Sequence, residues 1–132
     1  MDAGLILDTL ERASERCADP APLVYRRLFE LRPEFESLFV MDTDGGVRGS
    51  MLTTCFNAIL GLIEESDTQR VIISSSRFAH DGYGVAQRDF DLMFVAIRDT
   101  FRDLLGADWT GDTEAAWNIL LTEIATIGAS PE

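Results

Sequence analysis

The stretch His80–Phe90 decides how the rest of the chain is interpreted, and it reads His-Asp-Gly-Tyr-Gly-Val-Ala-Gln-Arg-Asp-Phe. His80 is the only histidine in the sequence, and it ends a segment with helical periodicity. Two glycines then mark a corner, and an apolar stripe of helical spacing begins directly after it. A single imidazole at such a corner can occupy one axial position of a flat metal cofactor.

Apolar residues at helical spacing follow this corner on its C-terminal side. The sequence predicts a long helix over residues 87–105, closed by Gly106. Its stripe comprises Phe90, Phe94, Ile97, Phe101 and Leu104. A last helix is expected after Trp109, with two acidic residues in its first turn, as the helix dipole favours. Its stripe comprises Ala116, Trp117, Leu120, Leu121, Ile124 and Ile127.

The N-terminal half shows the same periodicity in shorter pieces. Val71–Ile73 alone resembles a strand, but no other segment shows the alternation of apolar and polar residues expected of a partner strand. We therefore assign it to a helix that ends near His80. The remaining expected helices cover residues 3–17, about 20–32, 34–39 and 50–63, with a loop at 41–49 and a polar connection at 64–69. The predicted fold class is all-α, with a single domain over residues 1–132.

The charge of the chain excludes several classes of partner. At 132 residues it has a formal net charge of −12, and all eleven basic side chains are arginine. Nucleic acid and anionic membranes both favour a basic face, so we expect neither as a partner. The absence of lysine excludes Schiff-base chemistry and a phosphate-loop lysine. A basic protein partner remains compatible with this charge.

Cysteine usage and the lack of targeting signals indicate a cytoplasmic protein. Cys17 and Cys55 lie within apolar helical patterns and form no Cys-x-x-Cys motif, so we expect two buried, reduced thiols. No basic region followed by an apolar run marks a signal peptide. No stretch of about 18 apolar residues is expected to span a bilayer.

Several short motifs, in order, resemble the globin domain of bacterial flavohaemoglobins. The second and third helices of that family resemble Val24–Phe29, Pro33–Phe35 and Leu38-Phe39, and the distal helix resembles Phe56–Ile59. The proximal histidine and its corner resemble His80, Tyr83–Val85 and Phe90, and the final helix entry resembles Gly106, Trp109-Thr110 and Ala116-Trp117. The similarity spans roughly residues 20–121. It implies a globin fold of about six to eight helices around a haem (iron protoporphyrin IX).

The resemblance assigns roles to individual residues. His80 would bind the haem iron, Tyr25 would stand over the distal face, and Phe39 would wedge against the porphyrin. An acceptor near Ser76 would fix the imidazole tautomer by bonding its second ring nitrogen. The candidates for the apolar haem slot are Phe39, Leu52, Cys55, Phe56, Ile73, Val85, Phe90 and Phe94.

The chain departs from the family pattern at four points. Met51 stands where a distal glutamine or histidine is usual, and Cys55 replaces an aliphatic residue. Phe90 replaces a tyrosine that helps to polarise the proximal histidine, and the family's proximal glutamate finds no clear counterpart. No flavin- or nicotinamide-binding reductase module occurs in the sequence.

Each assigned residue also has an alternative interpretation. His80 could be a surface histidine at a helix end, and Tyr25 a core tyrosine bonded to a backbone carbonyl. Met51 could be an apolar gate or a sixth iron ligand through its thioether. Arg48 and Arg77 are the candidates for pairing with the haem propionates, and either could equally be a solvated charge.

Two classes of function follow from these expectations. The first is a haem protein that binds dioxygen or another diatomic gas, with nitric oxide dioxygenase activity if a separate reductase serves it. The second is a haem-free globin-like module for sensing or protein interaction, in which His80 would be incidental. A hexacoordinate electron-transfer haem with His80 and Met51 is a third, weaker hypothesis. The oligomeric state, monomer or homodimer, is left open by the pattern.

Overall fold

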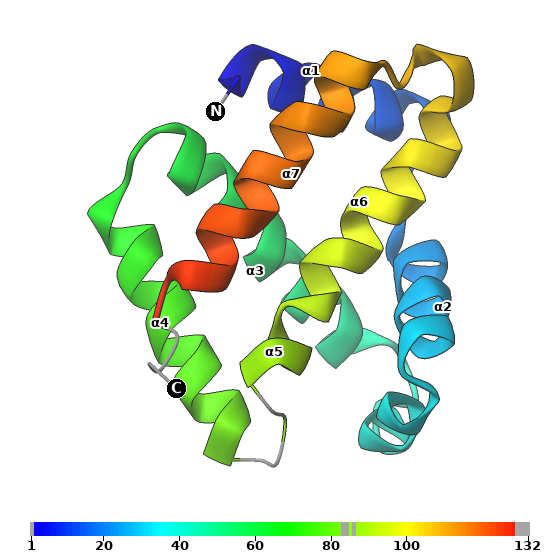
Figure 1. Ribbon diagram of the computed structural model, residues 1–132. Coiled ribbons are helices and arrows are strands. Elements are labelled where there is room, and N and C mark those ends of the chain that lie inside the picture. The colour runs from blue at the N-terminus through cyan, green and yellow to red at the C-terminus, as the bar shows by residue number, and fades with distance from the viewer. Residues whose placement is uncertain (1, 83–84, 86, 129–132) are drawn as a thin grey trace.

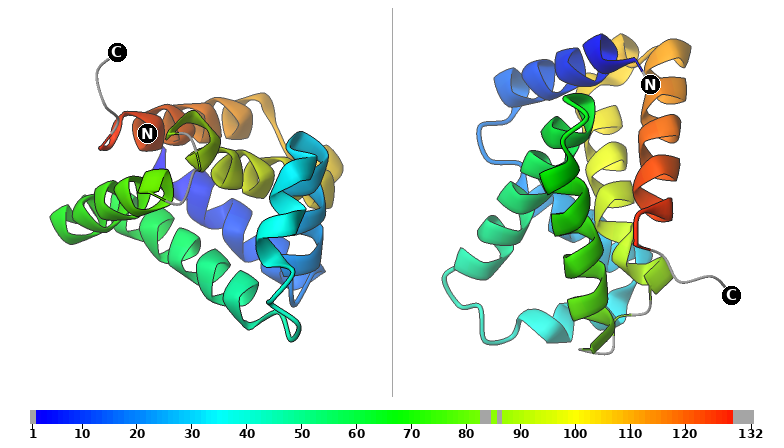
Figure 2. Two further views of the ribbon diagram at one scale, coloured as in Figure 1. Left: turned by 90° about the horizontal axis from the view of Figure 1, so that it is seen from below. Right: turned by 90° about the vertical axis from the view of Figure 1, so that its left-hand side faces the viewer.

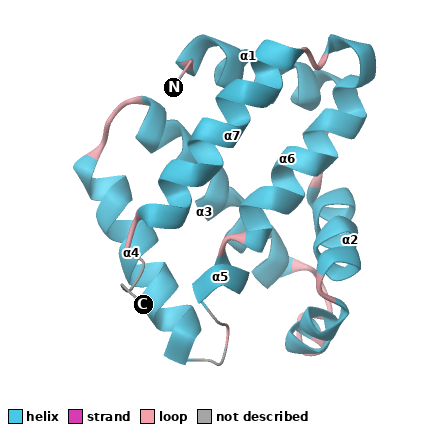
Figure 3. Ribbon diagram, in the orientation of Figure 1, coloured by secondary structure: helices cyan, strands magenta, loops and turns pink. Residues whose placement is uncertain are grey.

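The computed structural model describes residues 2–82, 85 and 87–128, and all regular structure in these residues is helical. This confirms the predicted all-α class. The helices are α1 (Ala3–Arg16), α2 (Ala21–Leu31), α3 (Gly46–Ile63), α4 (Asp67–Gly82), α5 (Gln87–Phe90), α6 (Leu92–Leu105) and α7 (Gly111–Thr126). Two 3-10 helices, η1 (Pro33–Phe39) and η2 (Gly106–Asp108), complete the set (Figures 1 and 3).

The helices α6 and α7 form an antiparallel pair that α1 crosses at one end, while α2 packs along α6 (Figure 1). The helices α3 and α4 lie beside this group, meet at their short connection and diverge toward their other ends (Figure 2, right). Gly61 permits the close approach near the connection, since a Cβ atom there would lie 2.0 Å from Cγ of Gln69. The V shape of this pair positions the candidate site.

The core is densest where α1, α6 and α7 meet. The Trp117 side chain is fully buried, and its indole Nε1 donates a hydrogen bond to Oγ1 of Thr9, 3.2 Å away. Phe101 meets the Trp117 ring edge-on at a centroid distance of 6.1 Å. These contacts follow the apolar stripes predicted for the last two long helices.

Helix α3 begins at Gly46, inside the segment expected to be a loop. The carboxylate of Asp42 accepts hydrogen bonds from the backbone amides of Val47 and Arg48, both at 3.0 Å, and Asp44 accepts from Gly46 at 2.9 Å. Three of the amides at the helix start are therefore satisfied by side chains. The glycines suggested a loop, but these aspartates extend the helix by one turn.

The long helix predicted over residues 87–105 is interrupted, and α5 and α6 meet at Asp91. The side chain of Asp91 receives two hydrogen bonds from the Arg77 guanidinium on α4, at 2.6 and 3.1 Å. Apolar periodicity continues across this break, so sequence spacing alone predicted one helix. Helix α2 begins at Ala21 with Pro20 as its N-cap, one residue after the expected start at about residue 20.

Helix α3 is long and apolar enough to cross a membrane by length and composition, with a mean hydropathy of 1.2, which differs from the sequence expectation. One such helix is weak evidence for a span. Its apolar character has a structural reason, because one face packs on the core through Leu52, Ile59 and Leu62 while another lines a cavity.

Candidate functional site

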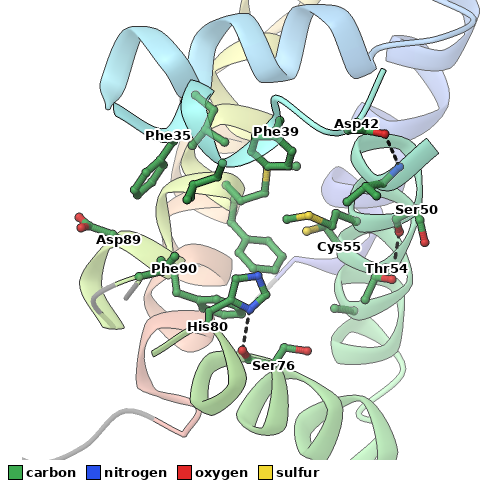
Figure 4. Close-up of a pocket in the computed structure, with 18 of the residues that line it drawn as sticks. Phe35, Phe39, Asp42, Ser50, Thr54, Cys55, Ser76, His80, Asp89 and Phe90 are labelled. Atoms are coloured by element: carbon green, nitrogen blue, oxygen red, sulfur yellow. Dashed lines mark hydrogen bonds between the residues drawn. The ribbon is translucent and has the colours of Figure 1, made fainter. Parts of the chain in front are cut away.

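A cavity of about 950 Å³ opens between the diverging ends of α3 and α4 (Figure 4). Segment η1 and the start of α6 complete its walls. Most of its lining is apolar. The lining residues are Leu28, Phe35, Leu38, Phe39, Met41, Asp42, Gly46, Val47, Ser50, Met51, Thr54, Cys55, Ala58, Ile72, Ile73, Ser76, His80, Val85, Asp89, Phe90, Met93 and Phe94.

His80 lies in the last part of α4 and lines this cavity. Its Nδ1 lies 2.7 Å from the backbone carbonyl oxygen of Ser76, and because a carbonyl only accepts, Nδ1 carries the proton. In the neutral imidazole, the other ring nitrogen, Nε2, is then the unprotonated one, and the ring faces the cavity (Figure 4). The structure confirms the predicted acceptor at Ser76.

Phe90 holds the imidazole from one side. The two rings meet edge-on with centroids 5.3 Å apart, and the guanidinium carbon of Arg77 lies 4.7 Å from the Phe90 centroid on the ring face. Phe90 therefore lies between the histidine that faces the cavity and a buried cation. The Phe90 ring packs against the imidazole but cannot form a hydrogen bond with it.

Arg77 does not reach the cavity mouth, where a propionate partner was expected. Its side chain is 1% exposed, and besides Asp91 it donates to the carbonyl oxygens of Ile124 and Ile127 at 2.8 and 2.9 Å. It thereby joins α4 to the C-terminal end of α7 and to the α5–α6 joint. We correct its expected role from cofactor binding to the positioning of helices.

Tyr25 is buried outside the residues that line the cavity. Its hydroxyl donates a hydrogen bond to the carbonyl oxygen of Arg48, 2.8 Å away, and burial raises the pKa of Tyr25 well above its ordinary value. This is the core-tyrosine alternative considered above. The hydroxyl has one proton, and that proton is used within the protein.

Arg48 and Phe56 also lie outside the lining. The Arg48 guanidinium binds the carboxylate and the backbone oxygen of Asp42, at 3.0 Å each, and it lies beside the cavity rim because Asp42 lines it. Phe56 stacks on Phe101 at 5.9 Å and belongs to the core, as does Leu52. The expectation that Phe56 and Leu52 line the slot is therefore corrected.

The other predicted slot residues do gather at the cavity. They are Phe39, Cys55, Ile73, Val85, Phe90 and Phe94, and Met51, which was expected at the distal position, also lines the cavity. Burial raises the pKa of the Cys55 thiol to about 12, so this side chain is an uncharged thiol at neutral pH. Both cysteines are free, as expected, and each is half-buried. Tyr83 and Gly84 of the predicted corner lie outside the described residues.

Sequence reasoning missed the residues that form the mouth of the cavity. Leu38 and Met41 are 57% and 89% exposed, and Val47 lies nearby at the start of α3. The irregular segment around them has no periodicity that could have assigned them a face. Val47 alone carried a signal, because it precedes Met51 by four residues and Cys55 by eight, and so shares their helix face.

Two ion pairs stand at the rim. Asp42 binds Arg48, and Asp89 accepts a hydrogen bond from Arg32 at 2.5 Å. Burial opposes the charge on Asp42, but the amides of Arg48 and Val47 and the Arg48 side chain outweigh it and hold the pKa of Asp42 below its ordinary value. The sequence analysis did not identify Arg32 as a cation near the site.

Comparison with known proteins gives one match. The globin family model matches residues 23–127, a range that contains every residue lining the cavity. No curated protein and no solved structure matches the chain.

Proposed function

The chain belongs to the globin family, and from this premise we propose that it binds haem in the cavity between α3 and α4 and holds a diatomic gas there. His80 would be the ligand to the iron through Nε2. Bound haem would supply an iron centre able to bind a diatomic gas, and the chain would supply the imidazole, the apolar enclosure and the rim charges.

The orientation of His80 carries this proposal. A haem ligand must be a neutral imidazole whose free nitrogen faces the cofactor, and the bond from Nδ1 to Ser76 leaves Nε2 in that state. A surface histidine would not need to enter an apolar cavity. The ring instead lies among cavity residues and against Phe90.

The size and chemistry of the cavity fit a porphyrin. Its volume of about 950 Å³ lies within the roughly 300–1,000 Å³ typical of cofactor and ligand pockets. Its walls are mostly aromatic and aliphatic, and such walls shield a porphyrin from water. Arg32 and Arg48 are about one-third exposed at the rim, so they are the cations that we propose for the two propionates, in place of Arg77.

Haem titration of the purified protein tests the proposal directly. The wild-type protein should take up about one haem per chain, and the reduced form should give the sharp carbon monoxide spectrum of a histidine-ligated haem. His80→Gly should lose stable haem binding, and added imidazole should restore the spectrum by filling the vacated space. Phe78→Ala changes an exposed side chain of the same helix and should bind haem as wild type does.

A wild-type protein that takes up no haem contradicts the proposal. Retention of an unchanged spectrum in His80→Gly without added imidazole contradicts the assigned ligand.

We further propose the narrower function of nitric oxide dioxygenase served by a separate reductase, in a single cytoplasmic domain like those of flavohaemoglobins. The motif order in residues 20–121 supports this likeness. The test is nitric oxide consumption by the haem-loaded protein in air with an artificial electron donor. Consumption no faster than that by free haem would reject this activity while leaving gas binding intact.

The second candidate is a haem-free sensory or protein-interaction module. It is favoured by the rim, where Arg48 and Arg32 are already paired with Asp42 and Asp89. The same haem titration separates the two candidates. Under this second proposal, His80→Gly would leave every property of the purified protein other than local stability unchanged.

A further inference from the structure

Helix α4 forms one edge of the molecule, and among the described residues no helix lies outside it (Figure 1; Figure 2, right). Two large apolar side chains stand on its outer face, Phe78 at 81% exposed and Val71 at 64% exposed. They are seven residues apart, or two helical turns, and so share one stripe. Exposed apolar side chains that gather on one face indicate a binding surface.

The rest of the outer face of α4 is small and uncharged. The arginines of this helix are directed elsewhere, since Arg70 pairs with Glu123 on α7 and Arg77 is buried. Asp67, in the first turn, bounds the face at one end. The exposed side chains between residues 68 and 79 are Thr68, Val71, Ser75, Phe78 and Ala79.

Helix α3, which packs beside α4, extends this uncharged surface. Residues 49–63 contain no acidic or basic side chain, and Thr53 and Leu60 are exposed among them. Helix α1 shows the ordinary pattern of a solvated helix instead, with Glu11 and Glu15 on its exposed face. A charge-free surface over two neighbouring helices is therefore a specific feature of α3 and α4.

The charge of the chain indicates what covers this surface. Two copies of a chain with a net charge of −12 repel each other, and this repulsion is smallest where both surfaces are uncharged. A basic partner would favour carboxylates, but none is exposed on α4 between residues 68 and 79. Depletion of charge and enrichment of aromatic side chains are typical of the centre of homodimer interfaces. A second copy of this chain is thus the partner that fits.

The order of residues along α4 suits a twofold interface, in which both copies use the same patch. Val71 and Phe78 lie equally far from the midpoint between Ser74 and Ser75. If two α4 helices cross antiparallel at this midpoint, Phe78 of one protomer meets Val71 of its partner, and the small serines allow close approach. The two Asp67 carboxylates then lie roughly 20 Å apart, beyond the Debye length of about 8 Å.

We propose that this protein forms a homodimer through the outer faces of α3 and α4, with the two α4 helices antiparallel. These helices have 18 and 16 residues, and side by side they present a face of roughly 25 by 20 Å. Two such faces bury roughly 1,000 Å² in total, which is the lower limit for a specific interface. The pairing is a property of the chain and does not require haem.

Sedimentation equilibrium of the purified chain, with and without haem, tests the proposal. At about 100 μM the wild type should give a mass near twice 14.7 kDa. Phe78→Glu places carboxylates at the uncharged interface and should raise the dissociation constant at least about tenfold. Ile119→Glu is the matched control, because Ile119 is 51% exposed on α7, and this variant should remain dimeric.

Salt dependence distinguishes this interface from an ionic one. Raising the salt from about 50 mM to about 500 mM screens the repulsion between the copies, so the wild-type dissociation constant should decrease. An increase would mean that ion pairs hold the dimer together, which contradicts the uncharged interface.

A cysteine beside the twofold axis tests the antiparallel arrangement. The Cα atoms of the two Ser75 residues should lie within the roughly 7 Å that a disulfide allows. Mild oxidation should therefore link two copies of Ser75→Cys, but not of Thr122→Cys, which is exposed on α7. The wild type, with half-buried Cys17 and Cys55, provides the background. Absence of a linked dimer in Ser75→Cys would exclude the antiparallel pairing.

Other results would overturn the dimer itself. One is a wild-type chain that stays monomeric up to about 100 μM. Another is a dimer that Ile119→Glu dissociates and Phe78→Glu does not, which would place the interface on α7. A third is a monomeric wild type that binds phosphatidylcholine vesicles while Phe78→Glu does not, which would assign the face to a lipid surface.

Discussion

Where α1 crosses α6 and α7, Ile6 and Trp117 are fully buried, whereas at the opposite end Leu38 and Met41 are more than half exposed around an open cavity. The packed end is fixed by apolar stripes that pack against one another. The open end is fixed by a few polar contacts, at Asp42, Ser76 and Arg77. The closely packed core and the open cavity therefore lie in different parts of one fold.

The largest expected effect is at the packed end. Trp117→Ala should lower the free energy of unfolding by about 3–5 kcal/mol, because it empties a fully buried site and leaves Thr9 without its donor. Phe39→Ala, at the half-buried cavity wall, should lower it by less than half as much. Urea denaturation of both variants provides the measurement, and equal losses would contradict the division into two ends.

Arg77 joins α4 to the C-terminal end of α7 and to the α5–α6 joint, and its removal should have the next largest effect. Arg77→Met keeps the apolar stem but removes the guanidinium hydrogen bonds to Asp91 and to the carbonyls of Ile124 and Ile127, so we expect a loss of about 2–4 kcal/mol. Arg70→Met is the matched control, since Arg70 also joins α4 to α7, through Glu123, but is 40% exposed.

The control should lose no more than about 1 kcal/mol, measured by the same denaturation experiment. Indistinguishable losses in the two arginine variants would show that the buried contacts of Arg77 contribute no more than a surface ion pair.

The smallest expected effect is a pH dependence at the open end. The folded protein holds the pKa of Asp42 below its ordinary value, so this carboxylate stabilises the fold above about pH 4. That contribution should disappear as the pH falls through the lowered folded pKa, because a protonated carboxyl no longer binds the amides of Val47 and Arg48 as an anion. Melting temperatures between pH 6 and pH 2 provide the measurement.

Asp42→Asn should show a shallower decrease in melting temperature over this acid range than wild type does. Asp44→Asn is the matched control, because Asp44 accepts only the amide of Gly46 at an exposed position. A decrease in Asp42→Asn as steep as that of wild type would exclude this carboxylate as the source.

The packed end was predictable from sequence because its contacts repeat along each helix. The stripes of the last two helices predicted the burial of Phe101, Trp117 and Leu120 without any knowledge of their partners. Helical spacing also placed Met51 and Cys55 on one face, and that face does line the cavity. The end of α4 near His80 was predictable because a glycine after helical periodicity is a local signal.

The rest of the site depended on contacts between distant segments. Tyr25 bonds to a carbonyl 23 residues away, and no spacing rule indicates where a single hydroxyl will find its acceptor. Arg77 was assigned to the mouth because it lies one turn before His80, yet its partners come from the α5–α6 joint and from α7. Phe56 lies one residue after a cavity residue, and one position on a helix was enough to turn it toward Phe101.

The close contact between Gly61 and Gln69 lies where α3 and α4 meet, away from the diverging ends that border the cavity. Helix α3 is about 27 Å long at 1.5 Å per residue, and its cavity-lining half lies at the end away from Gly61. A rotation of about 5° at this point would move the far end by roughly 2 Å, comparable to the size of a diatomic molecule. A small change at the contact between Gly61 and Gln69 would therefore alter the separation of α3 and α4 at the cavity, although Gly61 does not line it.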